Sequence, residues 1–415
     1  MLRVATAGSV DDGKSTLIGR LLYDAKALMT DQVADLKDLA NLTDGLRAER
    51  EQGITIDVAH RHFATPRRRF VLHDCPGHAQ YTRNMVTGAS TADLAVILVD
   101  ARRGLTEQSR RHAALAALLG VPQVTVCVNK MDLAGYSEER FDAVVRECLE
   151  FAAAAGLERL TFIPVSALHG DNVVERSAAM PWYSGEPLLA HLEGAPEAAG
   201  AADGPARLPV QYVIRHGEER HYAGRLASGT LRPGDEVVVL PSGGRSKVAR
   251  VIVSGEERRE GAAAPASVSV VLEDELDVGR GDLIARASEA PQPARELTAT
   301  VCWLGDAPAR AGATYLLKHT TRTVRARLDA IEDRLDVTSL ERAPADELEL
   351  NAIGRVRLRT GGEVMADPYA VSRATGAFIL IDEATNDTVG AGMVGDESRP
   401  ARRPHTCRPA DSRSD

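Results

Sequence analysis

The sequence is poor in cysteine and has no motif that would pair the cysteines it has. Its 415 residues include only five, an odd number, and they are scattered without a C-x-x-C pair. This pattern argues against a disulfide framework and against a zinc site of paired cysteines. We therefore expect reduced thiols and a cytoplasmic protein.

The sequence also lacks a long apolar run. No stretch approaches the roughly 20 apolar residues that a membrane helix needs. The first apolar run leads straight into a glycine-rich loop, which is not the pattern of a signal peptide. We therefore expect neither a membrane segment nor a secretory signal.

Positive charge is in deficit. Lys and Arg number 50 against 59 Asp and Glu, which gives a formal net charge of −9. This balance argues against a surface dedicated to nucleic acid, so we expect no nucleic-acid partner. Hydrophobic residues make up 44% and charged residues 26%, values typical of a soluble globular protein, and the length favours two or three domains.

The first 192 residues alternate short apolar runs with amphipathic segments. The runs LRVATA, FVLHD, LAVILVD, VTVCVNK and TFIPVSA each predict a buried strand, and all but the last lead into a helix-like segment. Such alternation is typical of a mostly parallel sheet with helices on both faces. The pattern predicts an α/β domain over residues 1–192.

Helix signals nearly vanish in the rest of the chain. Residues 193–208 are rich in Ala, Gly and Pro and predict a linker. Short strands and turns then predict two small all-β barrels, over residues 209–292 and 293–394. The polar, Pro-rich residues 395–415 predict a disordered tail.

The stretch GSVDDGKST lies between the first predicted strand and a helix-like segment. It fits G-x-x-x-x-G-K-[ST] in the context of a phosphate-binding loop, where glycines let backbone N–H groups converge on phosphate oxygens. The helix N-terminus adds a favourable dipole. Lys14 would bridge the β- and γ-phosphates, and the Ser15 hydroxyl would bind Mg²⁺. The predicted loop consists of Gly8, Ser9, Val10, Asp11, Asp12, Gly13, Lys14, Ser15 and Thr16.

A second motif closes the predicted strand FVLHD. It consists of Asp74, Cys75, Pro76 and Gly77. We expect Asp74 to hold the metal through water and the Gly77 N–H group to lie against the γ-phosphate.

Two further motifs identify the base. Asn129-Lys130-Met131-Asp132 ends the predicted strand VTVCVNK, and Ser166-Ala167-Leu168 ends the next strand. The Asp132 carboxylate can accept hydrogen bonds from N1–H and the 2-amino group of guanine, which adenine does not offer there. Lys130 can lie over the base, and a backbone N–H group in the second motif can reach the guanine O6. At the ends of successive strands, the set predicts a GTP site.

The stretches QGITI and DCPGHAQYTRNM resemble the translation-factor class of GTPases, which includes elongation factor Tu. In that class the threonine of GITI completes the coordination of Mg²⁺, and the histidine after DxxG orients the attacking water. The resemblance gives these roles to Thr55 and His78, and places Val10 and Ile54 between His78 and the γ-phosphate. Lys14, Thr55 and His78 are the expected catalytic residues, since this hydrolysis depends on positioning and charge neutralisation.

Longer stretches resemble one family within this class, the large GTPase subunit of bacterial sulfate adenylyltransferase. These are GSVDDGKSTLIGRLLYD, DGLRAEREQGITIDVAHRHF, TRNMVTGASTADLAVILVDARRG, MPWYSGEPLL, HYAGRLASG and TVGAGMV. Elongation factor Tu has histidine where Asp12 stands and threonine where Ser15 stands. The family usually has a longer leader, a longer segment after Tyr23, and threonine in place of Cys75. We interpret Cys75 as a tolerated small residue and not as a redox sensor.

The resemblance implies a division of labour between two subunits. In the family a small catalytic subunit converts ATP and sulfate to adenosine 5′-phosphosulfate and diphosphate, and the large subunit couples GTP hydrolysis to that step. The expected cofactors are GTP and Mg²⁺, and the expected partner is the small subunit, in a heterodimer or a higher hetero-oligomer. One phosphate loop occurs and no second G-x-x-x-x-G-K-[ST], so we do not expect a fused phosphosulfate kinase.

Two other functions are alternatives at this point. One is an elongation-factor-like GTPase that delivers charged tRNA, from which MPWYSG and YAGRLASG point away. The other is a nucleotide-bound scaffold without hydrolysis, which has no need for the set of Lys14, Thr55 and His78.

Some residues allow two interpretations. Trp182 and Tyr183 fit either an interface anchor or packing onto the GTP-binding domain. Arginines near the second switch region fit either a partner contact or a charged helix face, namely Arg102, Arg103, Arg110 and Arg111.

Overall fold

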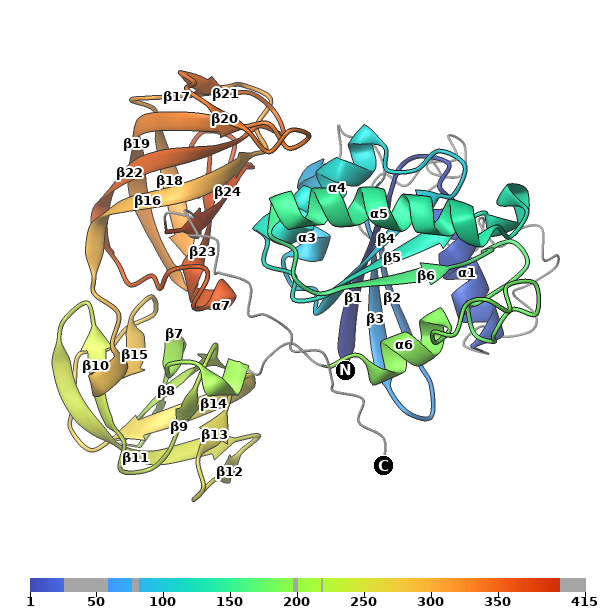
Figure 1. The fold of residues 1–415 in the computed structure, drawn as a ribbon. Helices are drawn as coiled ribbons and strands as arrows, with labels where there is room; N and C mark the ends of the chain where they lie inside the picture. The colour runs from blue at the N-terminus through green and yellow to red at the C-terminus, as the bar shows by residue number, and fades with distance from the viewer. Residues whose placement is uncertain (26–58, 77–81, 197–200, 218, 396–415) are drawn as a thin grey trace, which may run out of the picture.

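The computed structural model describes residues 1–25, 59–76, 82–196, 201–217 and 219–395 (Figure 1). Over these residues the chain forms an α/β domain followed by two β domains, as predicted. Among the described helices, none combines the length and the apolar character needed to cross a bilayer.

The α/β domain is built on one twisted sheet. Its strands are β1 (Leu2–Gly8), β2 (Ala59–Ala64), β3 (Arg69–Asp74), β4 (Leu94–Asp100), β5 (Val124–Asn129) and β6 (Leu160–Pro164). Its helices are α1 (Lys14–Asp24), α3 (Thr82–Ala89), α4 (Glu107–Leu118), α5 (Glu138–Ala155) and α6 (Leu188–Gly194), with a 3₁₀ turn at Met131–Ala134. The predicted strands are confirmed.

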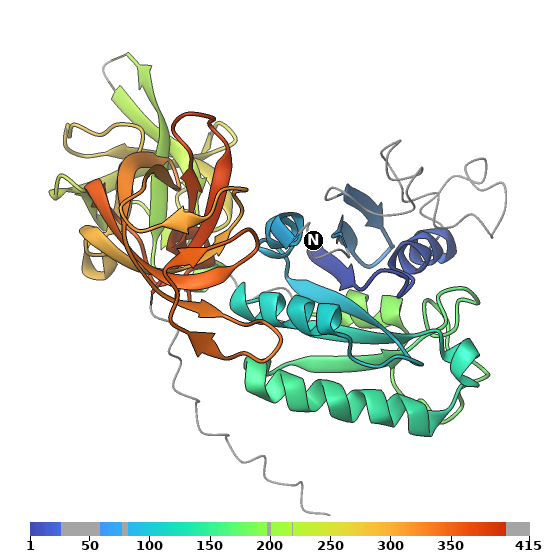
Figure 2. The same ribbon diagram turned by 90° about the horizontal axis from the view of Figure 1, so that it is seen from above.

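The sheet has the order β2-β3-β1-β4-β5-β6, in which β2 pairs antiparallel and the other strands pair parallel. Parallel strands are buried on both faces, which explains their continuous apolar runs. Residues such as Ala5 and Ala7 of β1 pack against α3, α4 and α5, whereas Leu2 and Val4 pack on the side of α1 and α6. Helices therefore cover both faces (Figure 2).

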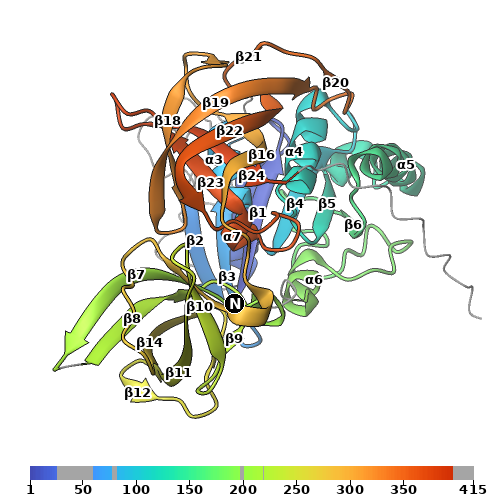
Figure 3. The ribbon, with the colours of Figure 1, turned by 90° about the vertical axis from the view of Figure 1, so that its left-hand side faces the viewer.

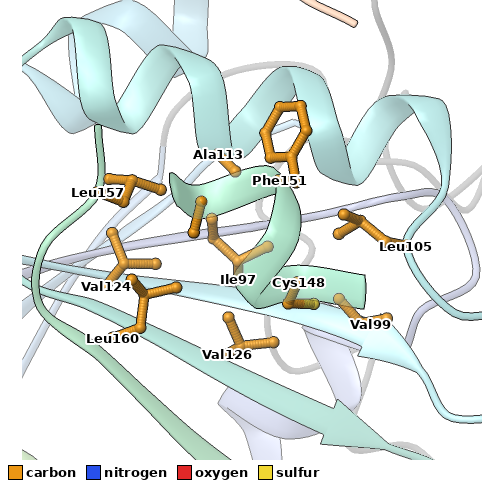
Figure 4. Close-up of a pocket in the computed structure, with 11 residues that line it drawn as sticks. Ile97, Val99, Leu105, Ala113, Val124, Val126, Cys148, Phe151, Leu157 and Leu160 are labelled. Atoms are coloured by element: carbon orange, nitrogen blue, oxygen red, sulfur yellow. The ribbon is translucent and has the colours of Figure 1, made fainter. Parts of the chain in front are cut away.

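A small cavity lies inside this core, between β4, β5 and the helices α4 and α5 (Figure 4). Its volume is about 20 Å³ and its lining is apolar, including Ile97, Val126 and Phe151. A void lined in this way offers a ligand no polar partner, so it belongs to the core packing and not to a binding site.

The first β domain closes on itself. Its strands are β7 (Arg207–His216), β8 (Glu219–Leu226), β9 (Thr230–Leu231), β10 (Glu236–Leu240), β11 (Gly244–Val253), β12 (Glu256–Glu257), β13 (Ala262–Ala263), β14 (Ala266–Leu272) and β15 (Leu283–Arg286). The order β10-β15-β7-β8-β14-β11 is closed by pairing of β10 with β11, so these strands form an antiparallel barrel. The predicted barrel is confirmed.

The second β domain repeats this arrangement. Its strands are β16 (Ala294–Trp303), β17 (Ala309–Arg310), β18 (Thr314–His319), β19 (Arg322–Leu335), β20 (Arg342–Ala343), β21 (Glu347–Leu348), β22 (Ile353–Val364), β23 (Ala377–Ile381) and β24 (Thr388–Val394), with α7 (Arg373–Gly376) before β23. The order β18-β23-β24-β16-β22-β19 is closed by pairing of β18 with β19. Closure leaves few unpaired strand edges.

The second β domain packs against the α/β domain on the side of α3 and α4 (Figure 1, Figure 3). Cys302, Val337, Tyr369 and Met393 belong to the same apolar cluster as the α3 and α4 residues. The Tyr369 hydroxyl donates to the Leu119 carbonyl at 2.9 Å, just after α4. The first β domain contacts the second through an ion pair between Arg207 and Asp367.

The connection between the α/β domain and the first barrel is shorter than the predicted linker 193–208. Helix α6 extends to Gly194, and β7 begins at Arg207. A short 3₁₀ turn covers Ala201–Asp203. The Ala-rich composition conceals both ends, because buried contacts and not local propensity decide where these elements stop.

Candidate functional site

The predicted phosphate loop joins β1 to α1. Asp11 and Gly13 adopt left-handed backbone conformations, with φ of 69° and 89°. A Cβ atom on Gly13 would lie 2.5 Å from Nδ2 of Asn129, so only glycine fits there. The Ser9 N–H group donates to the Asp12 carboxylate at 2.8 Å, and the Asp12 N–H group donates to the Ser9 carbonyl at 3.2 Å. These bonds hold the loop around the N-terminus of α1, where backbone N–H groups favour an anion.

Lys14 and Asp74 form a buried ion pair beneath the loop. The Lys14 ammonium lies 3.1 Å from Oδ1 of Asp74, and the side chains are 8% and 2% exposed. Asp74 ends β3 opposite Thr6 of β1, whose hydroxyl also donates to Oδ1 at 3.4 Å. The Lys14 ammonium is therefore at the phosphate loop but in contact with a carboxylate, which a phosphate oxygen would have to replace.

The donors next to this pair fit Mg²⁺. Ser15 lies partly buried in the first turn of α1, and Asp74 offers a carboxylate on the neighbouring strand. Mg²⁺ prefers oxygen ligands and usually binds through one or two protein groups, phosphate oxygens and water. The residues present therefore suit a metal shared with a nucleotide.

Asn129 connects the phosphate loop to the base end of the site. Its Nδ2 donates to the Asp12 carbonyl at 2.7 Å, and its Oδ1 accepts from the Ala167 N–H group at 3.0 Å. Asn129 ends β5, and the 166–168 segment follows β6, the neighbouring strand. The structure thus brings three of the predicted motifs to the carboxyl edge of one sheet.

Asp132 and Ser166 lie together at the base end. The Ser166 hydroxyl donates to Oδ1 of Asp132 at 2.7 Å, and His169 Nε2 lies 3.9 Å from Oδ2. The Asp132 side chain is 13% exposed, whereas Leu168 is 56% exposed. Oδ1 of Asp132 thus accepts a hydrogen bond from the protein, and the partly exposed carboxylate can accept further donors.

Lys130 lies between the phosphate loop and β4. Its backbone is left-handed with φ of 62°, and its ammonium donates to the Asp11 carbonyl and lies 3.1 Å from the Asp100 carboxylate. Burial alone would raise the pKa of Asp100, but hydrogen bonds from Arg102 and Lys130 hold that pKa well below its usual range. Asp100 was not among the predicted site residues, although a carboxylate that ends the apolar run LAVILVD is a visible signal.

A network of three hydroxyl groups beside the phosphate loop was also not predicted from the sequence. Ser9 Oγ lies 2.6 Å from Thr106 Oγ1 and 3.4 Å from Ser109 Oγ. Thr106 is the N-cap residue of α4 and accepts from the Ser109 N–H group. Contacts between residues about 100 positions apart have no signature in the sequence.

Three predicted site residues, Met131, Cys75 and Pro76, are buried inside the domain. Met131 is fully buried in the apolar core and can contribute only its backbone. Cys75 is also fully buried, and burial raises the pKa of its thiol to about 12, which keeps it protonated and unreactive. The interpretation of Cys75 as a structural residue is supported. Pro76 is buried, and Val10 is 37% exposed.

Asp12 is a buried carboxylate that forms no ion pair in the part of the chain that the structure describes. Its Oδ1 is buried and has no hydrogen-bond partner among the described residues. Burial raises the pKa of Asp12 to about 6, against the effect of the Ser9 N–H bond.

Three predicted site residues, Thr55, Gly77 and His78, lie outside the described residues.

Two of the ambiguous arginines, Arg102 and Arg110, and both aromatic residues have partners inside the α/β domain. The Trp182 indole N–H donates to the Tyr136 carbonyl at 3.0 Å and its ring packs against Phe141. Arg110 pairs with Glu147 at 3.1 Å. Of the two interpretations of Trp182, packing onto the domain is confirmed.

Comparison with known proteins gives matches along the chain. Residues 1–197 match the elongation factor Tu GTP binding domain, residues 220–285 match elongation factor Tu domain 2, and residues 296–395 match the GTP-eEF1A C-terminal domain-like family. The bifunctional enzyme CysN/CysC of Mycobacterium tuberculosis is 54% identical, covering 98% of this chain and 69% of that protein. Sulfate adenylyltransferase subunit 1 of Tolumonas auensis is 49% identical, covering 95% and 86%. A solved structure of sup35 with GDP has a TM-score of 0.45 at 23% identity, covering 95% of this chain and 93% of that one.

Proposed function

Because the chain belongs to the sulfate adenylyltransferase subunit 1 family, whose GTP-binding domain is of the elongation factor Tu type, we propose that it binds GTP and couples GTP hydrolysis to sulfate activation. A separate small catalytic subunit converts ATP and sulfate to adenosine 5′-phosphosulfate and diphosphate. The chain acts in the cytoplasm as one part of this hetero-oligomer.

The observation that supports a guanine nucleotide is the link that Asn129 makes between the two ends of the site. Through it the phosphate loop and the Ala167 backbone N–H group are held at fixed separation. Asp132 then accepts from N1–H and the 2-amino group of guanine. Adenine does not offer these donors and would leave part of this partly buried carboxylate unpaired, so adenine is rejected.

At the phosphate end, Lys14 exchanges its contact with Asp74 for one with the β- and γ-phosphates. Ser15 and Asp74 would hold Mg²⁺. When bound, the metal neutralises charge on the phosphates. The role of this chain's residues is to position the phosphates.

Thr55 and His78 complete the proposed site, on the family pattern. His78 orients the attacking water, and Thr55 would complete the coordination of Mg²⁺. The translation-factor alternative rests on motifs common to the whole class, and the relatives named above give it no support.

The experiment combines the purified chain with a small adenylyltransferase subunit, ATP, sulfate and pyrophosphatase. We expect adenosine phosphosulfate formation and GTP turnover to rise together, and only in the full mixture. GTP turnover that ignores the partner but responds to ribosomes and charged tRNA would establish the translation alternative instead.

His78→Ala tests the hydrolytic residue in the same assay. We expect near-normal GTP binding with turnover slowed by about 100-fold or more, since a positioned proton acceptor contributes on this order. His62→Ala on the edge strand β2 changes an exposed histidine and is the matched control. Unchanged turnover in His78→Ala would remove His78 from the mechanism.

A further inference from the structure

We propose that Asp100 is a positioning residue for the guanine base, which it serves by fixing the ammonium of Lys130. This inference rests on the proposed function, because it assigns Lys130 to the face of the base. Asp100 would set how tightly the nucleotide is held and not how fast it is hydrolysed.

The topology places the two residues together. Asp100 ends β4, and its Cα partner on the neighbouring strand is Asn129, the residue before Lys130. The Asp100 side chain is 1% exposed and that of Lys130 is 23% exposed. A carboxylate at the end of a fully buried strand is costly to desolvate, so it requires strong partners.

Asp100 is itself held rigidly. Oδ1 accepts from the Arg102 backbone N–H group at 2.9 Å and from Arg102 Nε at 3.1 Å, and Oδ2 accepts from Arg102 Nη2 at 2.7 Å. Oδ2 is also the oxygen that lies 3.1 Å from the Lys130 ammonium. The carboxylate therefore has one orientation, and it presents that oxygen to Lys130.

Lys130 is tethered from two sides as a result. Its ammonium contacts the Asp11 carbonyl of the phosphate loop and the Asp100 carboxylate of β4. A free lysine side chain has large rotamer freedom, which a ligand that needs one rotamer must restrict on binding. Fixing the ammonium in advance lays the aliphatic stem across the base-binding end and lowers that cost.

The interaction with Arg102 is separable from the one with Lys130. Arg102 has a side chain that is 47% exposed and contacts Asp100 from the solvent side. Loss of the Arg102 side chain leaves the backbone N–H bond and the Lys130 contact in place. Arg102→Gln is therefore a control that perturbs Asp100 without releasing Lys130.

The test measures GTP turnover and the release of a fluorescent GDP analogue from the full chain, in the reconstituted complex. Asp100→Asn keeps the shape and an acceptor for the Arg102 N–H group but removes the charge. We expect the KM for GTP to rise about tenfold and GDP release to quicken about tenfold, with kcat within about twofold of the wild type. Arg102→Gln should keep the KM within about twofold.

A double-mutant cycle decides whether Lys130 carries the effect. Lys130→Met keeps the stem and removes the ammonium, and we expect it to raise the KM about as much as Asp100→Asn. In the Lys130→Met background, Asp100→Asn should then add nothing. A further tenfold loss there, or an equal loss in Arg102→Gln, would overturn the inference.

The experiment distinguishes a variant that fails to fold from a failure of the proposed function or of the role of Asp100. If Asp100→Asn does not fold, Lys130→Met alone remains decisive because its side chain is partly exposed, and an unchanged KM in that variant overturns the inference. A wild-type chain that binds no guanine nucleotide overturns the proposed function and this inference with it. A wild-type chain that binds GTP, with Asp100→Asn unchanged, overturns only the role of Asp100.

Discussion

Lys14 and Asp74 form a buried ion pair under the phosphate loop, and Arg207 and Asp367 form another between the two β domains. The two pairs are similar in burial and differ in geometry. The Lys14 ammonium meets one carboxylate oxygen at 3.1 Å. Arg207 meets both oxygens of Asp367, with Nε at 3.0 Å and Nη2 at 2.9 Å.

The surroundings of the Arg207–Asp367 pair fix it further. Arg207 Nη2 also donates to the Glu289 carbonyl at 2.6 Å and Nη1 donates to the Ala206 carbonyl at 3.0 Å. Asp367 accepts in addition from the Thr375 hydroxyl at 2.6 Å. A planar guanidinium in such a network has strong directional preferences, whereas an ammonium is a point charge that can change partner.

The difference in geometry distinguishes a structural ion pair from one that can change partner. The Arg207–Asp367 pair links the two β domains, and we expect it to stay closed when a nucleotide binds. On the proposed function Lys14 binds phosphate, so we expect the Lys14–Asp74 pair to open each time a nucleotide binds. Four substitutions test this contrast.

Arg207→Met should have the largest effect. It leaves the Asp367 carboxylate buried without its cation, and breaking such a pair costs about 3 to 5 kcal/mol. We expect the free energy of unfolding of the β domains to fall by this amount in urea denaturation, while GTP affinity below the transition stays unchanged. Arg207→Lys keeps the charge without the fork and should lose less. An equal loss in both variants would contradict the argument from geometry.

Lys14→Met should act on binding instead. Loss of a charged hydrogen-bond donor to buried phosphates costs about 3 kcal/mol, which is roughly a hundredfold in GTP affinity. Calorimetric titration of GTP with Mg²⁺ measures it. Binding within twofold of the wild type would show that Lys14 stays on Asp74 and takes no part.

Asp12→Asn tests a third buried carboxylate, one that forms no ion pair among the described residues. Its pKa of about 6 in the folded state exceeds the ordinary value of 3.8, so its protonated form stabilises the fold. That contribution is complete below pH 4 and is lost as the pH rises through 6. The nucleotide-free variant should therefore gain up to about 2 to 3 kcal/mol over the wild type between pH 4 and pH 7. Parallel pH profiles of stability would contradict the prediction.

Tyr369→Phe should have the smallest effect. It removes the hydrogen bond to the Leu119 carbonyl, which holds the second β domain to the end of α4. A single such bond is worth about 1 kcal/mol. Thermal unfolding measures the loss, and Tyr212→Phe, at a side chain that is 67% exposed, should leave the melting temperature unchanged.

The fold was predictable where its physical causes are local. Apolar runs such as LAVILVD predicted the strands, and the glycine spacing of GSVDDGKST predicted the phosphate loop, in which Gly13 has a left-handed backbone. The order of motifs at strand ends predicted that Asn129, Asp132 and Ser166 would meet, because the carboxyl ends of parallel strands share one edge of the sheet.

The ion pairs were not predictable in this way. Arg207 and Asp367 lie 160 residues apart, and no pattern around either residue indicates that it pairs with the other. Likewise, the sequence assigns Lys14 to phosphate and Asp74 to the metal, but not the contact between them. Pairing across domains depends on packing of the whole chain, which local patterns do not record.

A structure of the chain with a non-hydrolysable GTP analogue and Mg²⁺ tests the contrast most directly. We predict that the Lys14 ammonium moves from Asp74 to the β- and γ-phosphates, while the Arg207–Asp367 contacts keep their present distances. A Lys14 that remains on Asp74 beside a bound nucleotide would contradict the account, and so would an Arg207–Asp367 pair that opens with it.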